Sequence, residues 1–202
     1  MSVEHSPILV IDLEATCWES NTPEGEPQSI HNMEIIEIGC ALTNRLGIVL
    51  DTRSFLVRPV RQPLLSAFCT ELTHITQAMV DKAQPLPRAI AQMNDWLDGA
   101  GPDLLWCSWG NYDLNHLTAQ CALDNVDSRL LHLPHLNLKK AWRRTTKQRK
   151  QTSLASAMDF HGLTFDGQPH RGIDDARNIV RLLPFLNWSL ADELVSKPAA
   201  LF

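Results

Sequence analysis

The stretch Ile8–Ala15, with the sequence ILVIDLEA, decides how the fold of this chain is interpreted. Its apolar and β-branched residues form a compact run typical of a strand that is covered on both faces. Two carboxylates, Asp12 and Glu14, interrupt that run. Side chains alternate along a strand, so both acids lie on one face, about 7 Å apart. Because unpaired carboxylates are costly inside an apolar sheet, the pair predicts a bound cation, a hydrogen-bond network or a solvated edge strand.

Segments typical of strands and helices alternate along the rest of the chain. Two strand-like runs, Glu34–Thr43 and Ile48–Val57, join through a turn that contains Gly47, which predicts a hairpin beside the first strand. We therefore expect an α/β fold, with a central mixed β-sheet flanked by helices. The other expected elements are a helical region from Leu64 to Gly99, a strand at Asp103–Trp109, and helices at Asp113–Ala122, Leu138–Thr145, Ser153–Phe160 and Asp174–Leu183.

Length and composition indicate an ordinary globular protein. With 202 residues, of which 44% are apolar and 20% charged, we expect a single domain over residues 1–202 with a core at about 7–187. The chain has neither a long apolar run nor the residue order of a secretion signal, so we expect a cytoplasmic protein without a membrane partner. No feature indicates an obligate protein partner. Its five scattered cysteines predict reduced thiols rather than disulfides or a zinc knuckle.

Positive charge is concentrated in one segment, from Leu138 to Gln151. This segment has seven basic residues and no acid, whereas the rest of the chain has 11 bases and 23 acids. A nucleic-acid partner is therefore compatible with the overall charge of −5. The segment is either a solvated helix surface or a surface that guides a nucleic-acid strand, and the sequence leaves both open.

Three further residues follow predicted strands or open predicted helices. Asp113 follows the second buried strand, at a position where open α/β sheets gather ligands. Asp175 lies at the start of the last core helix, and His170 lies five residues earlier on a glycine-containing loop. Each residue alone has a simpler structural interpretation, such as a helix cap, and Asp174 is itself a candidate cap. The combination with Asp12 and Glu14 carries the functional hypothesis.

These five residues, in this order, resemble the DEDDh superfamily of 3′-to-5′ exonucleases. The first family motif, Asp-x-Glu, matches Asp12 and Glu14; the second acid matches Asp113; the third motif, His-x(4)-Asp, matches His170 and Asp175. The resemblance covers most of the chain and implies a ribonuclease H-like exonuclease fold. It also implies hydrolysis of single-stranded nucleic acid from the 3′ end, with release of nucleoside 5′-monophosphates.

Four fragments are similar to the subfamily of the enhanced-RNA-interference and histone-mRNA 3′ exonucleases, which implies RNA rather than DNA as substrate. Two departures from the pattern are His74, which stands where a glycine is expected in an ELTGIT segment, and the absence of a SAP-like module. The fragments are DLEATCWE at Asp12–Glu19, EIIEIG at Glu34–Gly39, FCTELTHIT at Phe68–Thr76 and SWGNYD at Ser108–Asp113.

The resemblance assigns a role to each of the five residues. Asp12 is implied to bridge two divalent cations, Glu14 and Asp175 to complete the first metal site, and Asp113 to hold the second ion directly or through water. Ligands that are all oxygen suit Mg²⁺ or Mn²⁺ better than zinc. His170 is the candidate general base for the attacking water, with orientation of a phosphate as the alternative.

The resemblance also implies a closed pocket for the terminal nucleotide. Trp18 could stack on a base or simply belong to the core. Two other functions stay open: an RNA-binding adaptor without turnover, and a nuclease of the same superfamily for DNA or very short oligonucleotides. The residues implied to contact the nucleotide are Ala15 and Thr16 for the ribose, and Phe68, Leu72 and Thr73 for the base.

Overall fold

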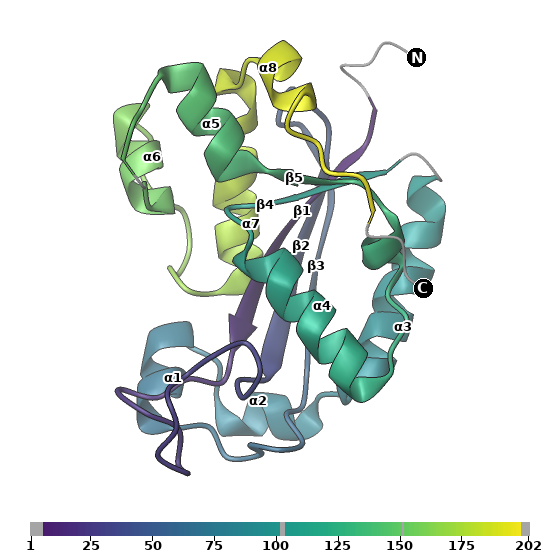
Figure 1. Ribbon diagram of the computed structural model, residues 1–202, viewed down its shortest axis with the longest axis vertical. Helices are drawn as coiled ribbons and strands as arrows, with labels where there is room; N and C mark the ends of the chain where they lie inside the picture. The colour runs from purple at the N-terminus through teal and green to yellow at the C-terminus, as the bar shows by residue number, and fades with distance from the viewer. Residues whose placement is uncertain (1–5, 102–103, 151, 199–202) are drawn as a thin grey trace.

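A computed structural model describes residues 6–101, 104–150 and 152–198 (Figure 1). Its sheet has the strand order β3-β2-β1-β4-β5, with β1 (Ile8–Ala15), β2 (Ile35–Thr43), β3 (Val49–Leu56), β4 (Leu105–Ser108) and β5 (His135–Asn137). β1 pairs antiparallel with β2 and parallel with β4, so the sheet is mixed as predicted. The predicted hairpin is confirmed as well, because β2 and β3 are antiparallel neighbours and Gly47 in their turn has a φ of 75°.

Helices flank this sheet, and the predicted helical region 64–99 divides into three of them. The first ends at His74, whose φ of 57° is left-handed. Glycine is the usual residue for that conformation, which explains why the family pattern has a glycine where this chain has His74. Within the described ranges, no helix is both long and apolar enough to cross a bilayer. The α-helices are α1 (Ala67–Thr73), α2 (Gln77–Lys82), α3 (Leu86–Leu97), α4 (Tyr112–Asp124), α5 (Leu138–Thr146), α6 (Leu154–Phe160), α7 (Gly172–Val180) and α8 (Trp188–Asp192), and the 3-10 turns are η2 (Asp98–Ala100), η3 (Arg129–His132) and η4 (Leu183–Phe185).

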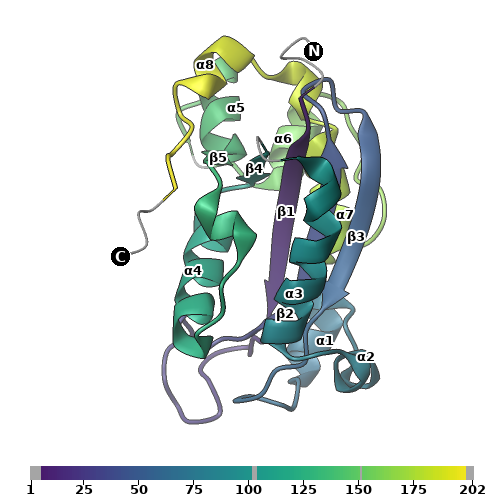
Figure 2. The same cartoon turned by 90° about the vertical axis from the view of Figure 1, so that its right-hand side faces the viewer.

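The central position of β1 creates an apolar layer on each side of the sheet. Val10 packs with Ile179 of α7 on one side, whereas Leu9 packs with Met93 of α3 on the other. Figures 1 and 2 show α7 and α3 on opposite sides of β1. The interpretation of β1 as an edge strand is wrong, because β1 lies between β2 and β4 in the strand order. β4 pairs only with Ile8–Val10, and beyond that point the N–H of Leu13 donates to Asp113 of α4 instead. All five cysteines are free thiols, as expected, and four of them are buried.

Three details differ from the sequence prediction. β5 has only three residues and α8 only five, too few to show a hydrophobic period, and neither was predicted. α7 begins at Gly172 rather than Asp174, with Arg171 at the N-cap, so Asp174 is not the cap. α7 ends at Val180, before Leu183, because Pro184 has no N–H to donate to the carbonyl of Val180, and a 3-10 turn follows.

Candidate active site

Three carboxylates meet where β1 runs past the start of α7. Asp12, Glu14 and Asp175 each offer one oxygen, and these oxygens all lie within 4.8 Å of one another. None of the three is an exposed surface acid. The first strand and the last core helix thus bring together residues that are more than 160 positions apart in the chain.

Two glycines allow α7 to approach the sheet closely enough for this meeting. A Cβ atom on Gly39 of β2 would lie 1.9 Å from the carbonyl carbon of Gly172, and a Cβ atom on Gly172 would lie 2.8 Å from the carbonyl oxygen of Asp12. Real Cβ atoms do not approach backbone so closely, so a side chain at either position would push α7 away from β1. Because neither glycine has a side chain, α7 can lie close enough to the sheet to place Asp175 beside Asp12.

Asp113 lies next to this group, in the first turn of α4, and is 5% exposed. Its Oδ1 accepts a hydrogen bond of 3.0 Å from the backbone N–H of Leu13, the residue between the two β1 acids. Asp113 does not belong to the group of three carboxylates that lie within 4.8 Å. It is nevertheless the strongest of the neighbouring charges that raise the pKa of Asp12.

Burial raises the pKa of all four of these acids, and repulsion by neighbouring carboxylates adds to this effect for Asp12, Glu14 and Asp175. Burial is the largest cause for Asp12, whose pKa lies well above its usual range, and it also raises the pKa of Asp113. Burial, followed by the charge of Asp175, raises the pKa of Glu14 to about 9. Burial likewise raises the pKa of Asp175 to about 7. Four carboxyl groups that resist ionisation together form a strongly attractive site for a cation.

A divalent cation also fits an unpaired polar atom of this group. Oδ2 of Asp175 is buried and has no hydrogen-bond partner among the described residues. Such an oxygen is costly unless something occupies its lone pairs. The donors are all carboxylate oxygens, as the hard cations Mg²⁺ and Mn²⁺ prefer, and the group has no thiol or imidazole that would favour zinc.

The raised pKa values predict that the metal-free protein loses stability as pH rises. In the unfolded chain, carboxyl groups release their protons at about pH 4, whereas Glu14 in the folded protein retains its proton up to about pH 9. Between these limits the folded state binds more protons, so raising the pH favours unfolding. In EDTA, the unfolding temperature should fall between about pH 5 and pH 9, and Glu14→Gln should make the fall shallower. Identical pH profiles for Glu14→Gln and the parent protein would contradict this explanation.

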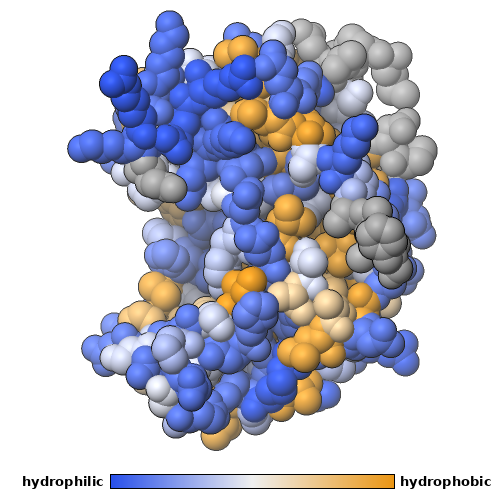
Figure 3. All heavy atoms as spheres, in the orientation of Figure 1, coloured by the Kyte–Doolittle hydropathy of each residue, from blue (hydrophilic) through white to orange (hydrophobic). Residues whose placement is uncertain are grey.

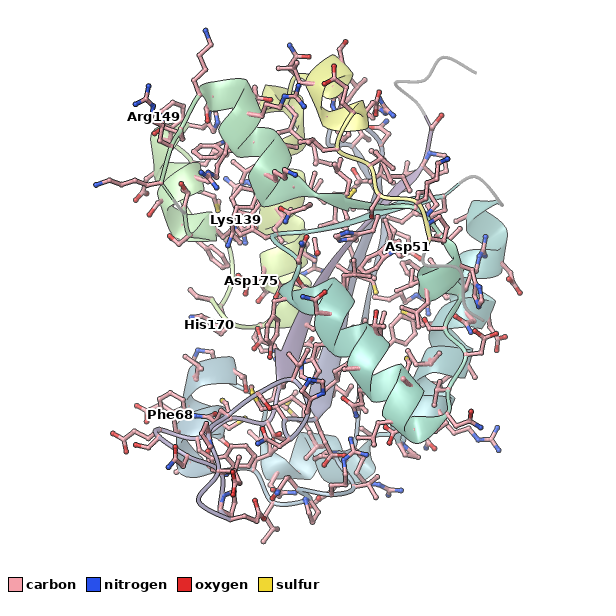
Figure 4. The ribbon with its side chains drawn as sticks, in the orientation of Figure 1. Asp51, Phe68, Lys139, Arg149, His170 and Asp175 are labelled. Atoms are coloured by element: carbon pink, nitrogen blue, oxygen red, sulfur yellow. The ribbon has the colours of Figure 1, made fainter. Side chains whose placement is uncertain are left out.

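His170 lies on the loop that leads into α7. Its side chain is exposed, and its backbone has a left-handed φ of 62°. Figure 4 shows Lys139, Asp175, His170 and Phe68 following one another along one open side of the molecule, from α5 down to α1. Backbone hydrogen bonds from His170 and Arg171 lower the pKa of Asp175 against the effect of burial. The loop that carries the imidazole therefore also contacts the metal-ligand candidate.

The predicted nucleotide-contact residues divide into two kinds. Phe68 is 39% exposed and Leu72 is half-buried, so both side chains are available to a ligand. Thr16 and Thr73 are each 1% exposed. The Thr16 hydroxyl accepts a hydrogen bond from the Glu34 N–H, and the Thr73 hydroxyl donates to the Cys69 carbonyl, so both serve the local fold.

Contacts to the end of β1 fix α1 beside the carboxylates. Ser66, the N-cap of α1, accepts a hydrogen bond from the Cys69 N–H and donates one of 2.6 Å to the carbonyl oxygen of Cys17. The Cys69 thiol donates to the carbonyl of Ala15. Ala15 itself is buried, and Trp18 is half-buried. Figure 3 shows the surface hollowed on its left side, between the region of α5 and α6 and the region of α1.

The basic segment forms α5 and the turn that follows it. Lys139 begins this surface at the active-site end: its Nζ lies 3.8 Å from where a Cβ on Gly110 would be, and its charge lowers the pKa of Asp113. Arg144 pairs with Glu193 at 2.6 Å, and Arg143 donates to the carbonyl of Arg149. Figure 3 shows strongly hydrophilic side chains projecting above the hollow in this region.

One buried acid beside the site was not identified as a site residue from the sequence. Glu37 of β2 is fully buried, lies opposite Glu14 in the β1–β2 register, and pairs with Arg171. The available signal was an acid within the apolar run of EIIEIG, which has the same need of a partner as the acids of β1. Its partner is 134 residues away in the chain, and no local pattern indicates such a pairing.

Comparison with known proteins places this arrangement in a family. The model of the family described as Exonuclease (RNase_T) matches residues 9–183. Human 3′-5′ exoribonuclease 1 is 36% identical over 182 residues, which cover 87% of this chain and 50% of that protein. The chain therefore corresponds to about half the length of this relative.

Two solved structures are similar over nearly the whole chain. The nuclease domain of 3′hExo, a DEDDh family member bound to rAMP, has a TM-score of 0.80 and 30% identity, covering 96% of this chain and 98% of that one. A 3′-exonuclease studied for 3′-end-specific recognition of the histone mRNA stem-loop has a TM-score of 0.81 and 30% identity, covering 97% of this chain and 68% of that one.

The fold, the family match and the acidic group define the class: the chain belongs to the exonuclease family, as a member of its DEDDh superfamily. Within that superfamily it groups with 3′-5′ exoribonuclease 1 and 3′hExo. The predicted membership of the DEDDh superfamily and the predicted ribonuclease H-like fold are thereby confirmed. DEDDh exonucleases use divalent metal ions, and the carboxylate group of this chain is consistent with that use.

Proposed function

We propose that this chain is a metal-dependent 3′-to-5′ exonuclease of single-stranded nucleic acid, with RNA favoured, that releases nucleoside 5′-monophosphates. The observation that carries the proposal is the group Asp12, Glu14 and Asp175, in which one buried carboxylate oxygen has no hydrogen-bond partner among the described residues. The family match over residues 9–183 supports the reaction class. The name of the human relative, an exoribonuclease, and the rAMP in the 3′hExo structure support RNA.

The acids would hold two divalent cations, Mg²⁺ or Mn²⁺. Bound there, the cations would lower the pKa of an attacking water and neutralise charge that develops on the phosphate. Asp12, whose pKa is raised by the charges of Asp113, Asp175 and Glu14, would contact both cations, with Glu14 and Asp175 completing one site. Asp113 would serve the other site through the oxygen that Leu13 leaves free, or through water.

His170 would act as the general base. Its exposed imidazole lies on the loop directly before the helix that carries Asp175, so it can take a proton from the attacking water without being a metal ligand itself. In the alternative role, orientation of a phosphate, it would contribute to substrate binding rather than to proton transfer.

Selection of a terminal nucleotide would depend on α1. Ser66 and Cys69 bind the end of β1, so Phe68 and Leu72 are held beside the acids as an apolar surface for the last base. The backbone of Ala15 would line the part of the pocket that holds the ribose. Burial of Thr16 and Thr73 favours an indirect role for both, in which they shape the pocket wall.

One assay tests the proposed function against its alternatives. Matched single-stranded RNA and DNA, labelled at the 5′ end, are incubated with Mg²⁺ or Mn²⁺, alongside a circular oligonucleotide of the same sequence. A descending ladder from linear RNA, with an intact circle and nucleoside 5′-monophosphates as products, supports the proposal. Faster decay of DNA would overturn the RNA preference, and bound but intact RNA would indicate an adaptor. Rapid decay of only two- or three-nucleotide substrates would indicate an oligonucleotide nuclease.

The basic segment supports a path for the single strand along α5. Lys139 and Arg143 lie four residues apart on one side of α5, beginning beside Asp113, and Lys147 follows as the left-handed C-cap at the end of that helix. At about 1.5 Å of rise per residue these three cations form a row about 12 Å long, enough for two or three phosphates of an extended strand. This row and the exposed Arg149 would guide the strand to the carboxylates.

We predict a smaller salt dependence when Lys147 and Arg149 are both changed to Glu. Each phosphate that the variant no longer neutralises should reduce the slope of log affinity against log salt by about 0.7, because fewer counterions are released. Fluorescence anisotropy with a long labelled RNA measures the slope, and a dinucleotide should keep its rate. Lys82→Glu with Arg88→Glu, on the side of α2 and α3, makes the same charge change as a control. Equal slopes in the two double variants would contradict the proposed path.

A further inference from the structure

Glu37 is a buried acid for which the proposed chemistry has no use. It is 0% exposed. All the hydrogen bonds that its carboxylate accepts come from groups outside its own strand. Ser54 of β3 donates its hydroxyl to Oε1 at 2.6 Å, and the N–H of Gly172 donates to Oε2 at 3.0 Å. Arg171 donates from Nε to Oε2 at 3.1 Å and from Nη2 to Oε1 at 3.2 Å. The carboxylate is therefore fully engaged, and two of its three partners are consecutive residues at the start of α7.

This position makes Glu37 the cap of α7. The N-cap residue of that helix is Arg171, whose own side chain makes no capping hydrogen bond. Glu37 instead satisfies the first free N–H, that of Gly172, and places a negative charge at the positive end of the helix dipole. The start of α7 is thus fixed to β2 rather than capped by its own residues.

The two functional side chains of this region lie on either side of that anchor. His170 directly precedes Arg171. Its φ of 62° lies in the left-handed region, which is energetically unfavourable for residues other than glycine. Asp175 lies one helical turn after Arg171, and its N–H donates to the Arg171 carbonyl at 2.9 Å. Movement of Arg171 and Gly172 would therefore displace both the imidazole and the carboxylate.

We propose that Glu37 and Arg171 are positioning residues: their bidentate ion pair holds the 170–172 loop so that His170 faces the carboxylate group at a fixed distance. The kinetic part of this inference rests on the exonuclease activity proposed above. Neither residue needs to contact the nucleic acid. The competing explanation is a buried ion pair that only contributes to stability.

The kinetic test uses two variants that change the charge in opposite directions. Glu37→Gln removes a negative charge and Arg171→Gln a positive one, but both break the bidentate contact. We expect each to reduce kcat by about 10- to 100-fold at saturating Mg²⁺, with KM for RNA within about twofold, because a displacement of about 1 Å can cost that much in rate. The double variant should be no slower than the worse single variant. Opposite effects of the two single variants would indicate a long-range charge effect and overturn the proposal.

Glu34→Gln is the matched control for stability. Glu34 is also a buried acid, and it accepts hydrogen bonds from the N–H groups of Val60 and Gln62, and pairs with Arg61 at 3.4 Å, away from α7. Its loss should lower the unfolding temperature as much as Glu37→Gln does, but leave kcat within about twofold. Equal reductions of kcat in both variants would overturn the positioning role.

A spectroscopic measurement separates this inference from the proposed function. The ¹³Cε1–¹Hε1 signal of His170, assigned by its absence in His170→Gln, should broaden or shift in Glu37→Gln and in Arg171→Gln, but not in Glu34→Gln. This readout does not depend on turnover, so it stands even if the wild-type protein cleaves no RNA and the proposed function fails. An unchanged His170 signal in both loop variants would refute the positioning role, whatever the activity.

Discussion

Asp175→Ala should abolish hydrolysis of RNA while leaving the fold intact, and Asp12→Ala should do the same. Each change removes a ligand from the three-carboxylate group, so the remaining oxygens hold a divalent cation poorly. Each also removes one of the mutually repelling buried charges, which raises the stability of the metal-free protein at high pH. The expected result is no detectable ladder, weaker binding of Mn²⁺ by calorimetry, and an unfolding temperature in EDTA at least as high as that of the wild type.

The control for these variants is Asp159→Ala, which removes an exposed acid from α6 outside the carboxylate group. It should retain full activity and normal binding of Mn²⁺. Full activity in Asp175→Ala or Asp12→Ala would refute the assignment of these residues as metal ligands. A large drop in the unfolding temperature in EDTA would show instead that the acids stabilise the fold.

His170→Ala should slow the chemical step by about 10²- to 10⁴-fold, the usual effect of losing a general base. The imidazole is exposed and makes no packing contribution to the core, so metal affinity and stability should stay close to those of the wild type. Single-turnover rates at saturating protein isolate this step from product release.

His132→Ala serves as the control, because His132 is a half-exposed histidine that pairs with Asp127, outside the hollowed side of the molecule. It should leave the single-turnover rate unchanged. If His170→Ala raised KM for RNA but kept the single-turnover rate, His170 would instead orient a phosphate.

The strand ILVIDLEA predicts much of the fold because burial on both faces of a strand leaves a clear mark in the sequence. Period two also places Asp12 and Glu14 on one face without any knowledge of their neighbours. β5 and α8 escape prediction, because three to five residues do not complete a recognisable period. The start of α7 was placed two residues late, since its cap comes from Glu37 on another strand rather than from a local Asp or Ser.

The candidate site shows the same division between local and distant information. The resemblance to the DEDDh exonucleases implied that Asp12, Glu14, Asp113 and Asp175 share one metal site, and three of these acids, Asp12, Glu14 and Asp175, do meet. The bond from the Leu13 N–H to Asp113 was not predictable, because it depends on how α4 packs against β1. The burial of Thr16 likewise arises from a contact with Glu34, 18 residues away.

Assembly of the site from the first strand and the last core helix has a consequence for the biosynthesis of this protein. A chain emerges from the ribosome from its N-terminus, so β1 is exposed long before α7 exists. Until Gly172 can dock against Gly39, the growing chain has the acids of β1 but neither Asp175 nor His170 beside them. Under the proposed function, the growing chain would therefore be unable to cleave its own messenger, ribosomal or transfer RNA until the docking step that completes the core also completes the active site.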